Sequence, residues 1–176
     1  MATEAELAKL MESGKTAFQD GSYESAAGTF QNAAKGYAAQ GDSLSEAEAK
    51  NNMSVALLQA GKSKQALEAV LGTDRVFEAA HDLRRQGMAV GNEGAALEAL
   101  KRTDEALAAY DRAAVILAQA GERDMLSMVK KSAAAIRLKR GQFGESAANM
   151  IGSLEAKEKP SLFDRILKFL VRLKPW

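Results

Sequence analysis

The sequence repeats with a fixed period of 40 residues. Four similar segments, GSYESAAGTF, GKSKQALEAV, KRTDEALAAY and GQFGESAANM, begin at residues 21, 61, 101 and 141. A second set of breaks lies halfway between them, at Gly41, His81 and Gly121. Each 20-residue interval has room for a helix of about 15 residues and a short turn, which is close to the usual helix length in globular proteins. The period therefore predicts a stack of helix pairs.

The composition favours helices throughout the repeated region. Ala, Glu, Lys, Leu and Gln dominate residues 1–159, and the only prolines are Pro160 and Pro175. The apolar–polar alternation that is typical of strands is missing there. We therefore predict an all-α fold with about four helix pairs, whose units start near residues 5, 45, 85 and 125. Residues 5–157 are expected to form eight antiparallel helices, with turns near residues 21, 41, 61, 81, 101, 121 and 141.

Alignment of the units separates small side chains from large ones. The small residues expected at helix contacts are Gly14, Ser54, Gly94 and Ala134 on the first helices, and Ala26, Ala66, Ala106 and Ser146 on the second helices. The large residues expected in the core are Phe30, Val70, Tyr110 and Met150, followed by Tyr37, Phe77 and Leu117. Small and large columns that alternate in this way indicate interdigitated helix packing.

Several polar and glycine positions have a structural interpretation. His81 replaces the glycines of the neighbouring units at the end of a second helix, so we expect it to cap that helix. Asp42 and Asp82 stand at first-helix starts, where a carboxylate caps free amides, and Glu122 and Asp124 are interpreted in the same way. The segment GMAVGNEG at residue 87 lacks the strand and the GK[ST] sequence of nucleotide sites. It indicates close helix contact, or alternatively a shallow patch that a ligand could approach.

These columns resemble the tetratricopeptide repeat, with 40-residue units similar to those of kinesin light chain or soluble NSF attachment protein. The resemblance implies a right-handed superhelix whose concave surface, lined by the first helices, binds peptides. The residues that it places on this surface are Lys15, Asn51, Asn52, Val55, Met88, Asn92, Met128 and Lys131. Asn52 and Asn92 share a column and resemble hydrogen-bond partners for an extended peptide backbone. The alternative is that these asparagines bond only to adjacent helices.

The charge and composition of the chain exclude several classes of function. A formal net charge of +1 gives no basic surplus for nucleic acid, so no nucleic-acid partner is expected. The chain has no cysteine, which excludes disulfides and thiol catalysis. No set of ligands or of nucleophile and base converges in the pattern, so we predict no enzyme activity, no cofactor and no metal site. No run of about 18 apolar residues predicts a membrane-spanning helix.

The tail SLFDRILKFLVRLKPW, residues 161–176, departs from the repeat. It has four basic residues and one acid, and its apolar residues form a wide face of an expected ninth helix. Three interpretations stay open: a cap for the array, insertion at a membrane surface, and docking to another protein. We expect Phe169, Leu173 and Trp176 to be offered to a partner protein or a membrane.

The sequence thus predicts two domains, residues 1–158 with the repeats and residues 161–176 with a basic amphipathic helix. The expected function is that of a non-enzymatic scaffold or adaptor that binds a peptide or helix of another protein on the concave surface. The alternative is a peripheral membrane adaptor or assembly factor tethered by the tail. The expected location is the cytoplasm, either free or at a membrane surface.

Overall fold

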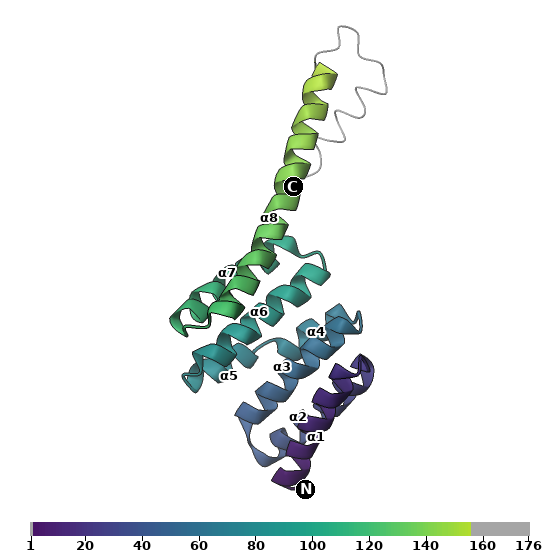
Figure 1. Ribbon diagram of the computed structural model, residues 1–176, viewed down its shortest axis with the longest axis vertical. Coiled ribbons are helices and arrows are strands. Elements are labelled where there is room, and N and C mark those ends of the chain that lie inside the picture. Colours follow the sequence, from purple (N-terminus) through teal and green to yellow (C-terminus); the bar gives the residue numbers. More distant parts are fainter. Residues whose placement is uncertain (1, 156–176) are drawn as a thin grey trace. The chain divides into compact units, whose positions relative to one another are not determined.

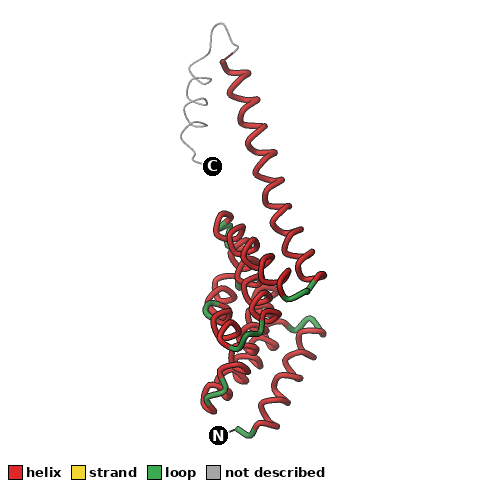
Figure 2. Tube along the Cα trace, turned by 90° about the vertical axis from the view of Figure 1, so that its left-hand side faces the viewer, coloured by secondary structure: helices red, strands yellow, loops and turns green. Residues whose placement is uncertain are grey.

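The computed structural model describes the backbone of residues 2–155 and the side chains of residues 2–141. This part of the chain is helical and contains no strand, which confirms the predicted all-α class for the described residues (Figure 1; Figure 2). The helices are α1 (Glu4–Gln19), α2 (Tyr23–Gln40), α3 (Ser43–Gln59), α4 (Ser63–Val70), α5 (Thr73–Ala79), α6 (Leu83–Ala99), α7 (Thr103–Gln119) and α8 (Arg123–Glu155). Short loops join them.

A left-handed residue ends a helix every 20 residues. These residues are Gly21, Gly41, Gly61, His81, Lys101 and Gly121, with φ angles between 57° and 76°. The amide of each such residue is bonded back into the helix that it follows, as when His81 N donates to the Glu78 carbonyl at 2.9 Å. The predicted turns from 21 to 121 are therefore confirmed, and so is the capping role of His81.

The carboxylates after two of these turns cap the next helix. Asp42 accepts from the Ser45 amide at 3.0 Å, and Asp82 accepts from the Arg85 amide at 2.9 Å. The hydrogen bond from the Arg85 amide stabilises the ionised carboxylate of Asp82 and so lowers the pKa of Asp82. The prediction that Asp42 and Asp82 act as N-terminal caps is confirmed.

The predicted turn at residue 141 is wrong. Helix α8 continues from Arg123 to Glu155 and includes Gly141, whose φ is not left-handed. A glycine inside a helix costs only about 1 kcal/mol relative to alanine, which is too little to end a helix by itself. The seventh and eighth predicted helices are thus one helix.

The fourth predicted helix contains an unexpected break. After α4 ends at Val70, Gly72 takes a left-handed φ of 83° and α5 begins at Thr73. The Thr73 hydroxyl donates to the Val70 carbonyl at 2.7 Å and fixes this corner. The corresponding residues of α2 and α7, Asn32 and Arg112, are helical. The second unit is therefore the one in which the second helix is bent.

Two compact units divide the chain, residues 1–133 and 134–176, and α8 begins in the first unit and continues in the second. In the first unit, helices that are adjacent in sequence pack on each other in the pairs α1–α2, α2–α3, α3–α4, α5–α6 and α6–α7. Helix α6 also packs on α3 and α4, which links the second helix pair to the third. The core of this unit consists mainly of alanine and larger apolar side chains from these helices.

The predicted small and large columns of the first three helix pairs meet in this core. In the fourth predicted pair Ala134 is exposed, and the side chains of Ser146 and Met150 lie outside the described residues. A Cβ atom added to Gly14 would lie 2.6 Å from Cε1 of Phe30, and one added to Gly94 would lie 2.8 Å from Cδ1 of Tyr110. In the second helix pair, the Ser54 hydroxyl instead donates to the Ala66 carbonyl at 2.8 Å. In these three pairs the first and second helices therefore approach closely, because the first helix has a small residue at the contact.

The glycine segment of α6 serves the same purpose. Added Cβ atoms at Gly87 and Gly94 would lie within 3.0 Å of Leu117 and Tyr110, both on α7. A Cβ atom at Gly91 would lie 3.3 Å from Cγ1 of Val129. The interpretation of GMAVGNEG as a close helix contact is confirmed.

We predict that Gly94→Ala lowers the free energy of unfolding by about 1–3 kcal/mol, because the added methyl group overpacks against Tyr110. The ring has little room to move, since it is buried and its hydroxyl donates to Glu98 at 2.8 Å. Gly28→Ala is the matched control, because Gly28 lies inside α2 with open space around its added Cβ. This control should raise the free energy of unfolding by about 0.5–1 kcal/mol. Urea denaturation measures both, and changes of the same sign would contradict the packing.

Candidate binding surfaces

The residues predicted for the concave surface lie on four helices. Lys15 is on α1, Asn51, Asn52 and Val55 are on α3, Met88 and Asn92 are on α6, and Met128 and Lys131 are near the start of α8. Asn51 is buried, whereas Asn52, Val55, Met88 and Asn92 are half-buried. Lys15, Met128 and Lys131 are exposed.

A hydrogen bond between two asparagines brings α3 and α6 together. Asn92 Nδ2 donates to Asn51 Oδ1 at 2.8 Å. Farther along the same pair of helices, Arg85 Nη1 lies 3.1 Å from Glu48 Oε2. Asn92 therefore bonds to the adjacent helix, which was the alternative interpretation of its column.

Asn52 differs from Asn92 although the two share a column. Its side chain is half-buried and makes no hydrogen bond with the described residues. Val55 follows one turn later on α3, and Met88 precedes Asn92 by one turn on α6. We call Asn52, Val55 and Met88 the α3–α6 strip. It has one partly exposed apolar side chain on each of the two helices, and on α3 an amide that can both donate and accept.

Lys15, a charged residue predicted for the concave surface, is already engaged in an ion pair. Lys15 Nζ lies 2.6 Å from Glu12 Oε1, and this contact raises the pKa of Lys15. Exposed ion pairs of this kind contribute only about 0–1 kcal/mol to the free energy of unfolding.

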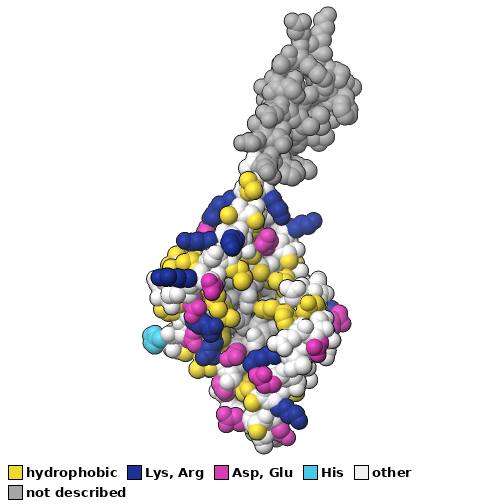
Figure 3. Space-filling model, viewed as in Figure 1, with side chains coloured by type: hydrophobic (Ala, Val, Ile, Leu, Met, Phe, Trp, Pro, Cys, Tyr) yellow, Lys and Arg dark blue, Asp and Glu magenta, His cyan; other side chains and the backbone are white. Residues whose placement is uncertain are grey.

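Hydrophobic atoms gather toward the middle of the first unit in Figure 3, with charged side chains of both signs around them.

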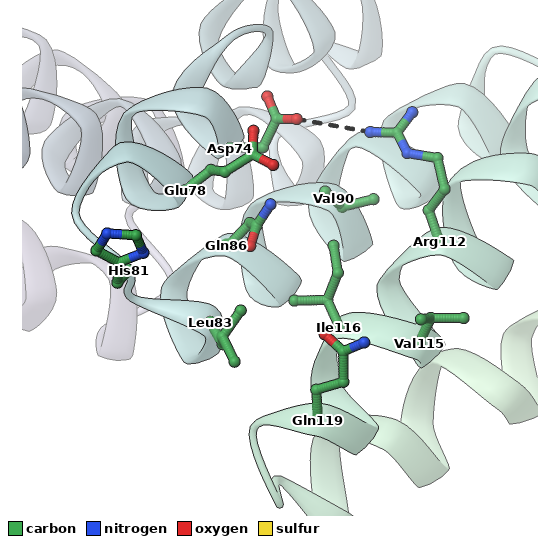
Figure 4. A pocket seen from close by; sticks show the side chains of 10 residues that line it. All are labelled: Asp74, Glu78, His81, Leu83, Gln86, Val90, Arg112, Val115, Ile116 and Gln119. Atoms are coloured by element: carbon green, nitrogen blue, oxygen red, sulfur yellow. Dashed lines mark ion pairs between the residues drawn. The ribbon is translucent and has the colours of Figure 1, made fainter.

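The structure contains a groove that the sequence analysis did not find. It lies over α6, between α5 and α7, and has a volume of about 690 Å³ (Figure 4). We call it the α5–α7 groove. Its lining residues are Asp74, Glu78, His81, Leu83, Gln86, Val90, Arg112, Val115, Ile116 and Gln119.

An ion-pair cluster crosses one end of the α5–α7 groove. Arg112 Nη2 lies 3.6 Å from Asp74 Oδ2 on α5 and 3.4 Å from Glu93 Oε2 on α6. Figure 4 shows the Arg112–Asp74 pair above Val90. The guanidinium thus joins α7 to the first turn of α5. The break at Gly72 places Asp74 in that first turn, so LGTD was the sequence signal for this part of the site.

No protein-family model and no curated protein matches the sequence. Among the described residues, no group of three or more His, Asp or Glu side chains is placed to hold a metal ion. No helix in the described part of the chain is long and apolar enough to cross a membrane. Phe169, Leu173, Trp176 and the expected ninth helix lie outside the described residues.

We predict different consequences for the adjacent asparagines of α3. Asn51→Ala removes a buried acceptor and leaves Asn92 without its partner, so the free energy of unfolding should fall by about 1–3 kcal/mol. Asn52→Ala is the matched control and should change it by less than about 0.5 kcal/mol. Chemical denaturation of both variants measures the difference. Equal losses would show that the Asn51–Asn92 bond does not stabilise the helix contact.

Proposed function

We propose that the protein is a non-enzymatic scaffold or adaptor that holds a peptide or helix of a partner protein. In this proposal the helix pairs form a right-handed, tetratricopeptide-like superhelix, and its concave surface includes the α3–α6 strip. The observation that carries the proposal is the strip itself, where Val55 and Met88 remain partly exposed and the amide of Asn52 makes no hydrogen bond with the described residues. Apolar contact supplies affinity, and the amide can pair with a peptide group without requiring a charge.

The two asparagines of the column have different roles in this proposal. Asn51 and Asn92 hold the two first helices side by side through their hydrogen bond. Asn52 is left to meet the partner. Binding is therefore expected to depend on Asn52 through a direct contact and on Asn92 through the position of α6.

A photo-crosslinking amino acid at each of two positions tests the surface. Placed at Met88, in the strip, it should capture a defined partner from cells. Placed at Lys35, an exposed residue on α2, it should not capture that partner. Adding Val55→Glu to the Met88 probe should abolish the cross-link, because a charge is placed where apolar contact is expected. Identical cross-links from both positions would contradict a binding site at the strip.

The second candidate function is a peripheral membrane adaptor or assembly factor. The observation that favours it is the sequence of the tail, in which four basic residues accompany apolar residues that would form a wide face of a helix. Under this proposal the protein works in the cytoplasm at a membrane surface.

Flotation with anionic vesicles tests the second candidate. The full chain should float with vesicles that contain an anionic lipid, and deletion of residues 161–176 should abolish flotation. Trp176→Ala should weaken it, because tryptophan prefers the membrane interface. Flotation that survives the deletion would contradict the tail as the anchor.

A further inference from the structure

The α5–α7 groove and the α3–α6 strip lie on opposite sides of α6. Gln86 and Val90 of α6 line the groove. Met88, which belongs to the strip, follows Gln86 by two residues, and Asn92, which bonds to α3, follows Val90 by two residues. Two residues correspond to about 200° around a helix axis. A ligand on the strip would therefore leave the groove free, and the groove is a separate surface.

Gln86 provides the first indication of a ligand. Only 8% of this residue is exposed, yet its side-chain amide makes no hydrogen bond with the described residues. No polar side-chain atom in the described part of the chain is both fully buried and unpaired, so this amide opens into the groove (Figure 4). A nearly buried amide without a protein partner is unusual, because burial of such a group costs free energy unless it is paired. The groove thus presents a donor and an acceptor at its floor.

The charges of the groove provide the second indication. Asp74 and Glu93 share the single guanidinium of Arg112, whereas Glu78 has no ion-pair partner among the described residues. Among the lining residues, two carboxylates therefore accompany one guanidinium. In the concavity one repeat earlier, between α2 and α4, Glu24 pairs with Lys62 at 2.8 Å, and Glu68 likewise has no ion-pair partner among the described residues. Glu78 is thus available to pair with a cation of a ligand.

The apolar lining provides the third indication. Leu83 and Val90 of α6 and Ile116 of α7 contribute apolar side chains to the lining (Figure 4). Leu83 is 37% exposed and Val115 is 59% exposed, so apolar surface remains in contact with water. A partner with an apolar side chain would remove this surface from water.

We propose that the α5–α7 groove binds an extended peptide segment of a partner protein, in which an apolar side chain stands next to a lysine or arginine. The apolar side chain lies against Leu83 and Ile116, and the cation pairs with Glu78. A main-chain amide of the segment pairs with Gln86. An extended segment is required, because a helix bonds its main-chain groups internally and would leave Gln86 without a partner.

The probe for this proposal is a displayed library of random linear peptides, selected against the full chain. We expect enrichment of a motif with an apolar residue and an adjacent or next-but-one basic residue. A synthetic peptide with that motif should bind the full chain, and replacement of its basic residue by norleucine should weaken binding about two- to fivefold, as expected for a partly exposed ion pair. Enrichment of acidic or helix-forming motifs, or of no motif, would overturn the proposal.

Three substitutions in the groove locate the peptide. Glu78→Gln should weaken the parent peptide about two- to fivefold and leave the norleucine peptide unchanged. Leu83→Ser should weaken binding of both peptides. Its matched control is Leu44→Ser, because Leu44 is also 37% exposed and lies in the first turn of α3. Peptide affinity that is the same for Leu83→Ser and Leu44→Ser would overturn the proposal.

Gln86→Met distinguishes a ligand contact from a structural role. Methionine fills a similar volume but cannot form the hydrogen bonds of an amide. The melting temperature should stay equal or rise, because a nearly buried unpaired amide is removed, while the peptide should bind several-fold more weakly. A lower melting temperature with unchanged affinity would overturn the assignment. Met88→Glu in the α3–α6 strip should leave peptide binding to the groove intact, so the two surfaces are tested separately.

Discussion

The close approach of the two helices in each pair is the contact on which the rest of the first unit depends. Phe30 and Tyr110 fill the space that Gly14 and Gly94 leave empty, so the partner helices have little freedom to slide. In the second pair the same position carries Ser54, which bonds to a main-chain carbonyl, opposite a helix with the smaller Val70 in the large column. The three pairs therefore use related contacts with side chains of complementary size.

The packing within the pairs is shared by the repeats, whereas the two candidate surfaces lie where the repeats differ. Asn51 is the only asparagine in its column, since Met11 and Gly91 occupy the same position in the neighbouring units. It therefore bonds to Asn92 and leaves Asn52 unbonded. Gly72 bends the second helix of the second repeat and creates the first turn of α5, which carries Asp74 of the groove. Both candidate surfaces result from departures from the repeat.

The sequence predicted the features that depend on local residues and on columns. The turns at residues 21 to 121 followed from residues that accept a left-handed conformation, and the buried columns followed from side-chain size. The continuation of α8 through Gly141 could not be predicted in this way, because glycine permits a turn without requiring one. The groove was also missed, because its side chains come from three helices, α5, α6 and α7, that belong to two different repeats of the sequence. The alignment likewise gave Asn52 and Asn92 the same role, because a shared column does not show which residue of the adjacent helix each side chain meets.

The spacing of the left-handed residues has a consequence for the descent of such a chain. One residue inserted within a helix turns every later face of that helix by about 100°, which would move its core positions toward water. Loss or duplication of a whole 40-residue unit keeps each face where it was. Gene duplication in whole units is therefore the route by which this array can change its length without losing its core. Asn51 and Gly72 are positions at which the second repeat departs from its neighbours while the 40-residue period is kept.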